Sequence, residues 1–216
     1  DVYKRQPVCI TKSYMGVVAY FTAEIGLWSE LHTYSGGLGV LAGDHVKSAA
    51  DDELPLVGVT LLYRRGYGRQ HLDQNGIQTE TYRDLDPAKH LKDTGVILSL
   101  PLDGTELLAR VWKAEIRGVT GHTVPVFFLD TFHPENNERH LNLGLTLYGG
   151  DDWVRIRQEY LLGVGGVRLL EQMGYDVDGL HLNEGHCTFA LLEMLGKGWS
   201  REELAKRVLF TTHTPV

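Results

Sequence analysis

The chain has 216 residues and a formal net charge of −7, with 43% apolar and 23% charged residues. These values are ordinary for a folded globular protein, and they argue against a disordered, collagen-like or low-complexity chain. Because the acidic residues are scattered, the charge pattern disfavours nucleic acid or an anionic membrane surface as a partner. No apolar run reaches the roughly 18 residues of a membrane helix, so we expect no membrane span and a cytoplasmic location.

The first part of the chain predicts a strand, a glycine turn and a helix. Residues 1–14 show no helical or strand period, and we interpret them as a loose extension of a domain that covers 15–216. The predicted strand, turn and helix lie at 17–21, 36–39 and 40–51. A second apolar strand at 56–63 would close a right-handed βαβ unit if the two strands are parallel.

The middle of the chain, about 67–130, has the pattern of antiparallel strands. Asn75-Gly76 and Asp103-Gly104 are two-residue hairpin signals. The expected strands are 96–100, 106–112 and 124–129. We therefore predict a β-rich insertion, or an extension of the sheet, in this region.

The last part of the chain alternates helices and strands again. Apolar spacing predicts a long helix over 152–173, in which three glycines indicate close packing. A strand, a helix, a second helix with a capping box and a final strand are expected at 179–183, 187–195, 200 onward and 208–212. The whole pattern predicts an α/β sheet covered on both faces, with ligands at the carboxyl ends of its strands.

Polar side chains are expected at three of these strand ends. Glu24 follows the first strand, Asn183-Glu184-Gly185-His186 follows a later one, and His213 follows the last. Glu24 could instead be a surface or helix-capping residue, and His213 could simply hold a strand end. Two glutamates at one sheet edge would also suit glycoside hydrolysis, which uses paired carboxyl groups.

Two loops add to the predicted site. Ser35-Gly36-Gly37-Leu38-Gly39 precedes a helix, where backbone N–H groups and the helix dipole favour an anion such as phosphate. The alternative is a tight turn that needs only small residues, because the pattern is neither a P-loop nor a dinucleotide fingerprint. Tyr148-Gly149-Gly150-Asp151-Asp152 precedes the long helix and is either a plain N-cap or a gate over the site.

No metal site is expected. Cys9 and Cys187 are too few for a disulfide framework or a thiolate site, so we expect free thiols. His181 and His186 lack the spacing of a helical zinc motif, because His181 lies in a predicted strand and His186 in the turn after it.

Seven segments, in order, resemble the α-glucan phosphorylase family, which comprises the glycogen, starch and maltodextrin phosphorylases. The likeness is greater to the shorter bacterial and archaeal branch, and it covers about 17–216. The segments are YFTAEIGL (20–27), YSGGLGVLAGDH (34–45), LYRRGY (62–67), LYGGD (147–151), RQEY (157–160), NEGH (183–186) and TTHTPV (211–216). The glycine segment alone is loosely shared with glycogen and starch synthases, so the combination of segments carries the resemblance.

The resemblance implies a Rossmann-like amino-terminal domain of the GT-B architecture, in which two domains face each other across a cleft. It also implies reversible phosphorolysis, in which inorganic phosphate cleaves the terminal α-1,4 bond of a glucan with retention and yields α-glucose 1-phosphate. Pyridoxal 5'-phosphate is the implied cofactor, held mainly by a second domain. The chain stops at Val216 inside a family segment, so we expect a fragment that is inactive alone. A homo-oligomer is a further expectation for the full-length protein.

The resemblance also implies roles for individual residues. Those implied to belong to the catalytic cleft are Glu24, Asn183, Glu184, His186 and His213. Those implied to approach the phosphate and the sugar, or to gate their access, are Gly36, Gly37, Leu38 and Asp151. Ile25 departs from the family, which usually has an aromatic residue there. Two other interpretations stay open: a nucleotide-sugar glucosyltransferase of the synthase type, and a non-catalytic glucan-binding module.

Overall fold

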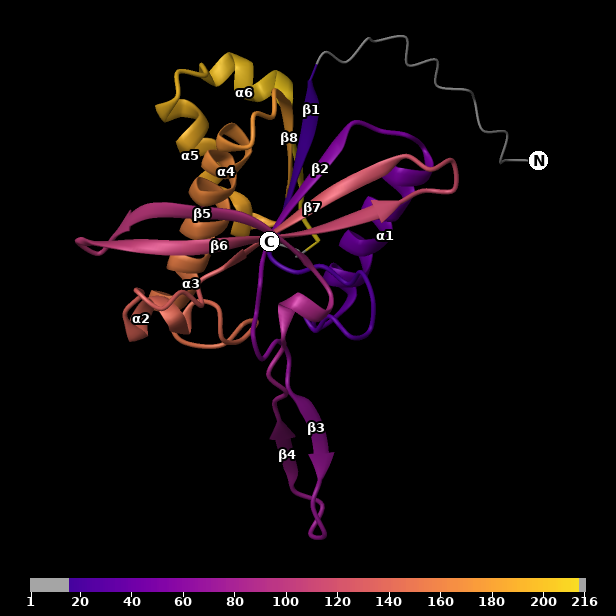
Figure 1. The fold of residues 1–216 in the computed structure, drawn as a ribbon, viewed down its shortest axis with the longest axis vertical. Coiled ribbons are helices and arrows are strands. Elements are labelled where there is room, and N and C mark those ends of the chain that lie inside the picture. The colour runs from indigo at the N-terminus through magenta and orange to yellow at the C-terminus, as the bar shows by residue number, and fades with distance from the viewer. Residues whose placement is uncertain (1–15, 214–216) are drawn as a thin grey trace.

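The computed structural model describes residues 16–213, so the loose extension predicted for 1–14 lies outside the described residues. Its strands form a large central sheet and a separate hairpin (Figure 1). The central sheet contains β1 (Val17–Thr22), β2 (Leu56–Leu61), β5 (Lys92–Leu102), β6 (Thr105–Arg117), β7 (Thr123–Asp130), β8 (Val177–Asn183) and β9 (Val208–Thr211). The hairpin contains β3 (Arg69–Leu72) and β4 (Gln78–Thr81).

Helices lie on both faces of the central sheet (Figure 1). The α-helices are α1 (Gly37–Asp51), α2 (Glu138–Asn142), α3 (Asp152–Tyr160), α4 (Gly166–Gln172), α5 (Phe189–Gly196) and α6 (Arg201–Arg207). The shorter turns are η1 (Pro87–Lys89), the π-helical η2 (Leu161–Gly165) and η3 (Gly185–Cys187). Helix α1 contacts β2, β6 and β7, whereas η2 contacts β1, β2, β5 and β7.

The strand order is β5-β6-β7-β2-β1-β8-β9, and the five strands from β7 to β9 are mutually parallel. The chain proceeds from β1 to β2 and β7 on one side, and it later adds β8 and β9 on the other. The order therefore reverses between β1 and β8, and in α/β sheets the crevice at such a switch point binds ligands. The predicted α/β class, with a mostly parallel sheet, is confirmed.

Alternate strand residues supply two separate cores. Phe21, Val59 and Leu129 belong to the cluster that includes the η2 and α4 side chains. Their neighbours Tyr20 and Phe128 point to the opposite face and pack with α1. This alternation follows from the two-residue period of a strand, and burial on both faces explains the continuous apolar runs that marked these strands in the sequence.

Glycines allow the helices to approach the sheet closely, as predicted for the helix over 152–173. A Cβ at Gly166 would lie 2.5 Å from a ring carbon of Phe21 and 2.8 Å from a methyl group of Val59. A Cβ at Gly43, on α1, would lie 2.0 Å from the carbonyl oxygen of Gly26. All three distances are shorter than the contacts that a real Cβ makes in packed proteins, so these positions require glycine.

The β-rich region differs from a simple antiparallel insertion. β5 and β6 form the predicted hairpin at Asp103-Gly104, where both residues have positive φ, and they extend the central sheet. β7 is antiparallel to β6 but parallel to β2, so it is a central strand of the same sheet. The physical reason is visible in its burial, because 126–130 are buried on both faces, as is typical of an internal parallel strand.

Three predicted boundaries were also wrong. Helix α1 begins at Gly37 rather than at residue 40, because glycine at the cap and in the first turn is compatible with a helix start. β2 ends at Leu61 rather than at 63, since residues 64–66 form their backbone hydrogen bonds with 144–147. The helix over 152–173 consists of α3, η2 and α4, in which the π turn interrupts the regular hydrogen bonds beside three glycines.

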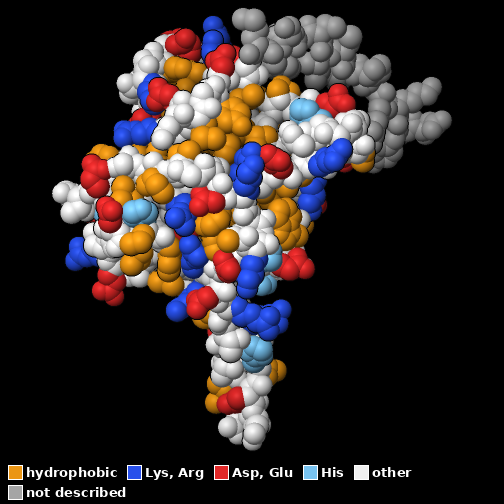
Figure 2. All heavy atoms as spheres, viewed as in Figure 1, with side chains coloured by type: hydrophobic (Ala, Val, Ile, Leu, Met, Phe, Trp, Pro, Cys, Tyr) orange, Lys and Arg blue, Asp and Glu red, His pale blue; other side chains and the backbone are white. Residues whose placement is uncertain are grey.

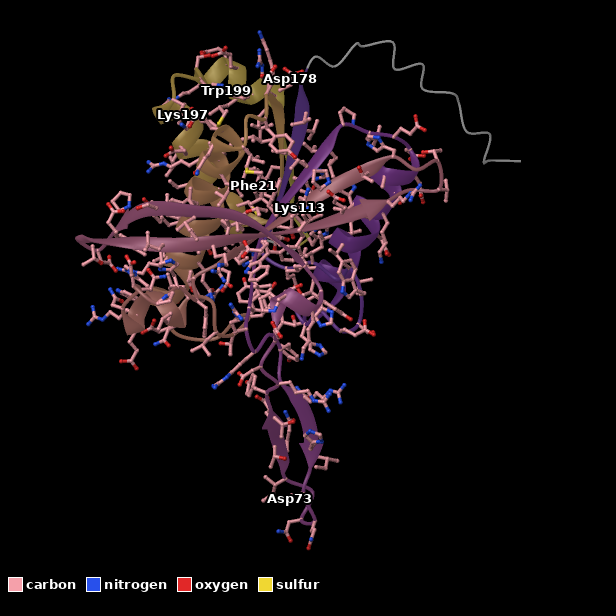
Figure 3. The ribbon with its side chains drawn as sticks, in the orientation of Figure 1. Phe21, Asp73, Lys113, Asp178, Lys197 and Trp199 are labelled. Atoms are coloured by element: carbon pink, nitrogen blue, oxygen red, sulfur yellow. The ribbon has the colours of Figure 1, made fainter. Side chains whose placement is uncertain are left out.

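The β3–β4 hairpin projects from the body of the molecule (Figure 1), and Asp73 lies at its tip (Figure 3). Mostly polar side chains cover it (Figure 2), and every residue of both strands is exposed. The Asn75-Gly76 turn predicted this hairpin correctly. None of the helices within 16–213 is both long and apolar enough to span a membrane.

Candidate active site

The predicted site residues converge on the carboxyl ends of β1 and β8. Thr22 and Asn183, the last residues of the two strands, are partners in the parallel pairing. The Asn183 amide Nδ2 donates to Thr22 Oγ1 at 3.1 Å, and the Thr22 hydroxyl donates to the carbonyl oxygen of Glu24 at 2.8 Å. These bonds hold the two strand ends together, so Glu24 and Asn183 lie side by side at one sheet edge.

Glu24 is buried, with only 2% of its surface exposed. Its Oε2 accepts a hydrogen bond from the Ser35 backbone N–H at 2.6 Å, and its Oε1 accepts one from the Tyr148 hydroxyl at 2.7 Å. Burial, followed by the hydrogen bond to Glu24, raises the pKa of the Tyr148 phenol well above its usual range. The phenol therefore stays protonated and donates to the carboxylate.

The glycine loop, residues 35–39, leads into helix α1 and includes its first turn. Gly36 is the extended N-cap residue, no side chain caps the helix, and the first turn contains no acidic residue. Gly36 and Gly37 are exposed, and a Cβ at either position would meet nothing within 4 Å. The packing of the described chain therefore does not explain why glycine stands at these two positions, whereas a ligand that contacts the backbone N–H groups would explain it. Leu38, half-buried in the first turn, lies beside them.

Asn183 and Glu184 both bind His213. The His213 Nε2 lies 3.0 Å from Asn183 Oδ1, and because that oxygen only accepts, Nε2 carries the proton. The Glu184 carboxylate accepts the backbone N–H of His213, and the Glu184 backbone N–H donates to Thr211 at 2.9 Å. Glu184 has φ of +72°, which is uncommon for a residue with a side chain and is often found at functional sites. The third predicted strand end therefore joins the other two.

His186 lies in η3, and its ring is close to the ring of Tyr148. The two ring centroids are 6.1 Å apart, and a small pocket of about 20 Å³ between the loop and α3 is lined by both rings, Arg155 and Glu159. The pocket has room for about one water molecule. The His186 Nδ1 atom is buried without a hydrogen-bond partner in the described chain.

Asp151 is the exposed N-cap of α3, where its side chain accepts the Val154 backbone N–H at 3.1 Å. This contact is the plain N-cap role considered from the sequence, and the gating role stays a prediction. Tyr148, three residues earlier in the same loop, is the residue that reaches Glu24. Sequence reasoning overlooked it, although a tyrosine directly before two glycines in a polar loop could have indicated it.

A second cluster was also overlooked. The rings of Tyr20, His45 and His181 lie with centroids 4.7 to 5.0 Å apart, on the α1 face of the sheet. Burial and then the neighbouring His45 lower the pKa of His181 to about 4. His181 had been considered only as a metal ligand, and within 16–213 no group of three His, Cys, Asp or Glu residues is placed to hold a metal ion. Cys187 is a buried free thiol, as expected, and Cys9 lies outside the described residues.

The fold and this set of residues define an α/β protein. Its candidate site lies at a topological switch point and combines polar side chains with the uncapped amino terminus of α1. A glycogen phosphorylase of Mycobacterium tuberculosis is 39% identical over 92% of this chain and 25% of its own length. A maltodextrin phosphorylase of Thermococcus litoralis is 36% identical over 92% of the chain and 25% of its own length. A glycogen phosphorylase of Aquifex aeolicus is 35% identical over 94% of the chain and 31% of its own length.

These relatives confirm the resemblance to the α-glucan phosphorylase family over most of the chain. No protein-family model matches the chain. The chain spans between a quarter and a third of the length of these three relatives.

Proposed function

We propose that this chain contributes the glucan- and phosphate-facing half of an α-glucan phosphorylase, as a Rossmann-like domain of a GT-B enzyme. The whole protein would cleave terminal α-1,4 bonds with inorganic phosphate and release glucose 1-phosphate. One observation carries the proposal: the uncapped amino terminus of α1 lies at the same sheet edge as the Asn183–His213 pair. An anion site beside amide and imidazole groups suits a phosphate that attacks a sugar.

The glycine loop supplies the anion-binding part. The first N–H groups of a helix have no partner within the helix, and the helix dipole favours negative charge at this end. With Gly36 and Gly37 exposed and free of side chains, a phosphate oxygen can approach these donors closely. The half-buried Leu38 would pack against the apolar face of the sugar.

His213 and His186 supply groups for sugar hydroxyls, whereas Asn183 is buried and acts through His213. The Asn183–His213 hydrogen bond orients the imidazole, and Glu184 holds the backbone that carries it. His186 is aimed toward the pocket beside Tyr148. Glu24 does not act as a free base in this scheme, because it is 2% exposed and both of its oxygens already accept hydrogen bonds from the chain.

The resemblance also implies pyridoxal 5'-phosphate. The lysines within 16–213 lie at positions 47, 89, 92, 113, 197 and 206, and none of them directly follows β1 or β8, so the described residues do not fit the aldehyde end of that cofactor. We propose that the rest of the whole protein binds it. The cytoplasmic location and the homo-oligomer stay predictions.

The whole protein tests this proposal. Incubated with maltodextrin and inorganic phosphate, it should release glucose 1-phosphate, and the reverse reaction should release phosphate. Glucosyl transfer from a nucleotide sugar, without any phosphorolysis, would support a glucosyltransferase of the synthase type. Glucan binding without either reaction would support a binding module. Both of these results would contradict the proposal.

A further inference from the structure

Glu24 is the point at which two loops, far apart in the sequence, meet. One carboxylate oxygen accepts the backbone N–H of Ser35, which directly precedes the N-cap of α1. The other accepts the hydroxyl of Tyr148, from the loop before α3. A buried carboxylate that accepts a hydrogen bond on each oxygen is held in one orientation, and so are its donors.

The backbone that carries Tyr148 is held firmly. Residues 64–66 run beside 144–147, with Arg64 donating to Gly144 at 2.7 Å and Leu147 donating to Gly66 at 3.2 Å. Arg64 is itself held by the fully buried Asp130, through bonds of 2.6 and 3.2 Å. Tyr148 follows this segment with φ of +57°, a conformation that persists only where the surroundings impose it.

The glycine loop packs directly on the other side of Glu24. A Cβ at Gly39 would lie 2.9 Å from Glu24 Oε2 and 2.4 Å from the Cβ of Tyr34. The Gly26 backbone N–H donates to Gly39 at 2.7 Å, so the first turn of α1 is fastened to the segment after Glu24. A displacement of the carboxylate would therefore displace Ser35 and the start of α1 with it.

We propose that Tyr148 and Glu24 are positioning residues that hold the glycine loop in register with the 148–151 loop. The hydrogen bonds from Tyr148 and Ser35 to Glu24 form a bridge between the two loops, and this bridge sets the direction of the N–H groups at the amino terminus of α1. Its importance for phosphate binding rests on the proposed function. A catalytic carboxylate would need an oxygen free to reach the reacting sugar. Here Glu24 uses both oxygens to join two loops, so its neutral analogue glutamine could replace it in part.

The bridge can be measured in the whole protein without any enzyme assay. In Tyr148→Phe, amide hydrogen exchange at Ser35 should accelerate about tenfold, because its acceptor loses the second donor that orients it. Tyr160→Phe is the matched control, since it removes a hydroxyl that donates to Pro101 at 3.0 Å from α3. Unchanged exchange at Ser35 in Tyr148→Phe, or equal acceleration in the control, would overturn the proposal.

A second measurement uses the whole enzyme. Tyr148→Phe should raise the KM for phosphate about tenfold and leave the KM for glucan within about twofold of wild type. Glu24→Gln should keep at least about ten times the activity of Glu24→Ala, because its amide can accept from Ser35 and donate to Tyr148. Adding Tyr148→Phe to Glu24→Ala should cost nothing further.

The two proposals fail in different ways. Equal loss of activity in Glu24→Gln and Glu24→Ala would show that the carboxylate is catalytic and would overturn the positioning role. Faster exchange at Ser35 in a protein that performs no phosphorolysis would leave the bridge standing and overturn the proposed function. Unchanged exchange at Ser35 in a Tyr148→Phe enzyme that still performs phosphorolysis would overturn the bridge and leave the proposed function standing.

Discussion

His213 and the glycines before α1 are the residues whose side chains, or lack of them, bear most directly on the proposed chemistry. His213 is held by Asn183 and Glu184, and it is nevertheless exposed at the sheet edge. Gly36 and Gly37 are exposed without any neighbour that would exclude a side chain. Substitutions at these residues should therefore affect ligand binding more than folding.

Gly37→Val in the whole enzyme should abolish phosphorolysis and leave the folded fraction unchanged. A valine side chain would occupy the space through which the N–H groups of α1 reach phosphate, while its Cβ meets nothing within 4 Å in the described chain. Gly196→Val is the matched control, because a Cβ at that helix end also meets nothing within 4 Å. Phosphate KM, kcat and the thermal midpoint should be measured on both variants. An unchanged phosphate KM with near-normal turnover in Gly37→Val would show that the glycines serve only the turn.

His213→Ala in the whole enzyme should lower kcat/KM for glucan by about 5- to 150-fold, which corresponds to the loss of about 1–3 kcal/mol from an unpaired polar group. Cofactor content and the melting temperature should change little, because the imidazole is exposed. The alternative role, a histidine that only holds the strand end, predicts a lower melting temperature with normal kinetics of the folded fraction. Both quantities should be measured on one preparation.

At the scale of elements, helix α1 connects the site to the core. Its amino terminus forms the glycine loop, and its buried residues Ala42 and Val46 pack on the sheet beside Tyr20. Gly43 lies in the middle of this contact, where the helix approaches the backbone at Gly26. The close approach therefore places the uncapped helix end next to the carboxyl end of β1.

Gly43→Ala should destabilise the protein by about 1–3 kcal/mol, because the added Cβ would lie 2.0 Å from the Gly26 carbonyl oxygen. Alanine is the better helix former by about 1 kcal/mol, which offsets only part of this overpacking. Gly196→Ala, where a Cβ meets nothing, should be neutral or slightly stabilising. Urea unfolding of the two variants measures the difference, and equal midpoints would contradict the packing argument.

At the scale of the whole molecule, the cluster of Tyr20, His45 and His181 joins β1, β8 and α1. Burial lowers the pKa of His45, and burial together with His45 lowers the pKa of His181 to about 4. Both histidines are therefore neutral in the native state at neutral pH. In the unfolded chain a histidine has a pKa of about 6.5, so folding and protonation are linked.

The free energy of unfolding should fall as the pH is lowered from about 6.5 toward about 4, because the unfolded state takes up a proton first. His181→Gln should flatten this part of the stability profile, whereas His71→Gln, on the exposed β3–β4 hairpin, should leave it unchanged. Thermal midpoints across this pH range provide the measurement. The same pH dependence in wild type and His181→Gln would show that the cluster is not responsible.

Much of the site was predictable from the sequence because its residues lie at or just after apolar runs that indicate strands. Apolar runs at 17–21, 179–183 and 208–212 indicated strands, and the parallel geometry of an α/β sheet then brings Glu24, Asn183 and His213 to one edge. The two hairpins were predictable as well, because Asn-Gly and Asp-Gly have few alternatives in turn conformations.

Local patterns determined these features because burial and turn conformation depend on residues that are close in the sequence. Only the tertiary structure decided three other features. These are the parallel pairing of β7 with β2, the residue at which α1 begins, and the hydrogen bond from Tyr148 to Glu24. Strand neighbours and helix ends depend on packing across the whole fold, and the Tyr148–Glu24 bond joins residues that are 124 positions apart. No local pattern carries such a contact, because it arises only when the strands bring two distant loops to the same edge.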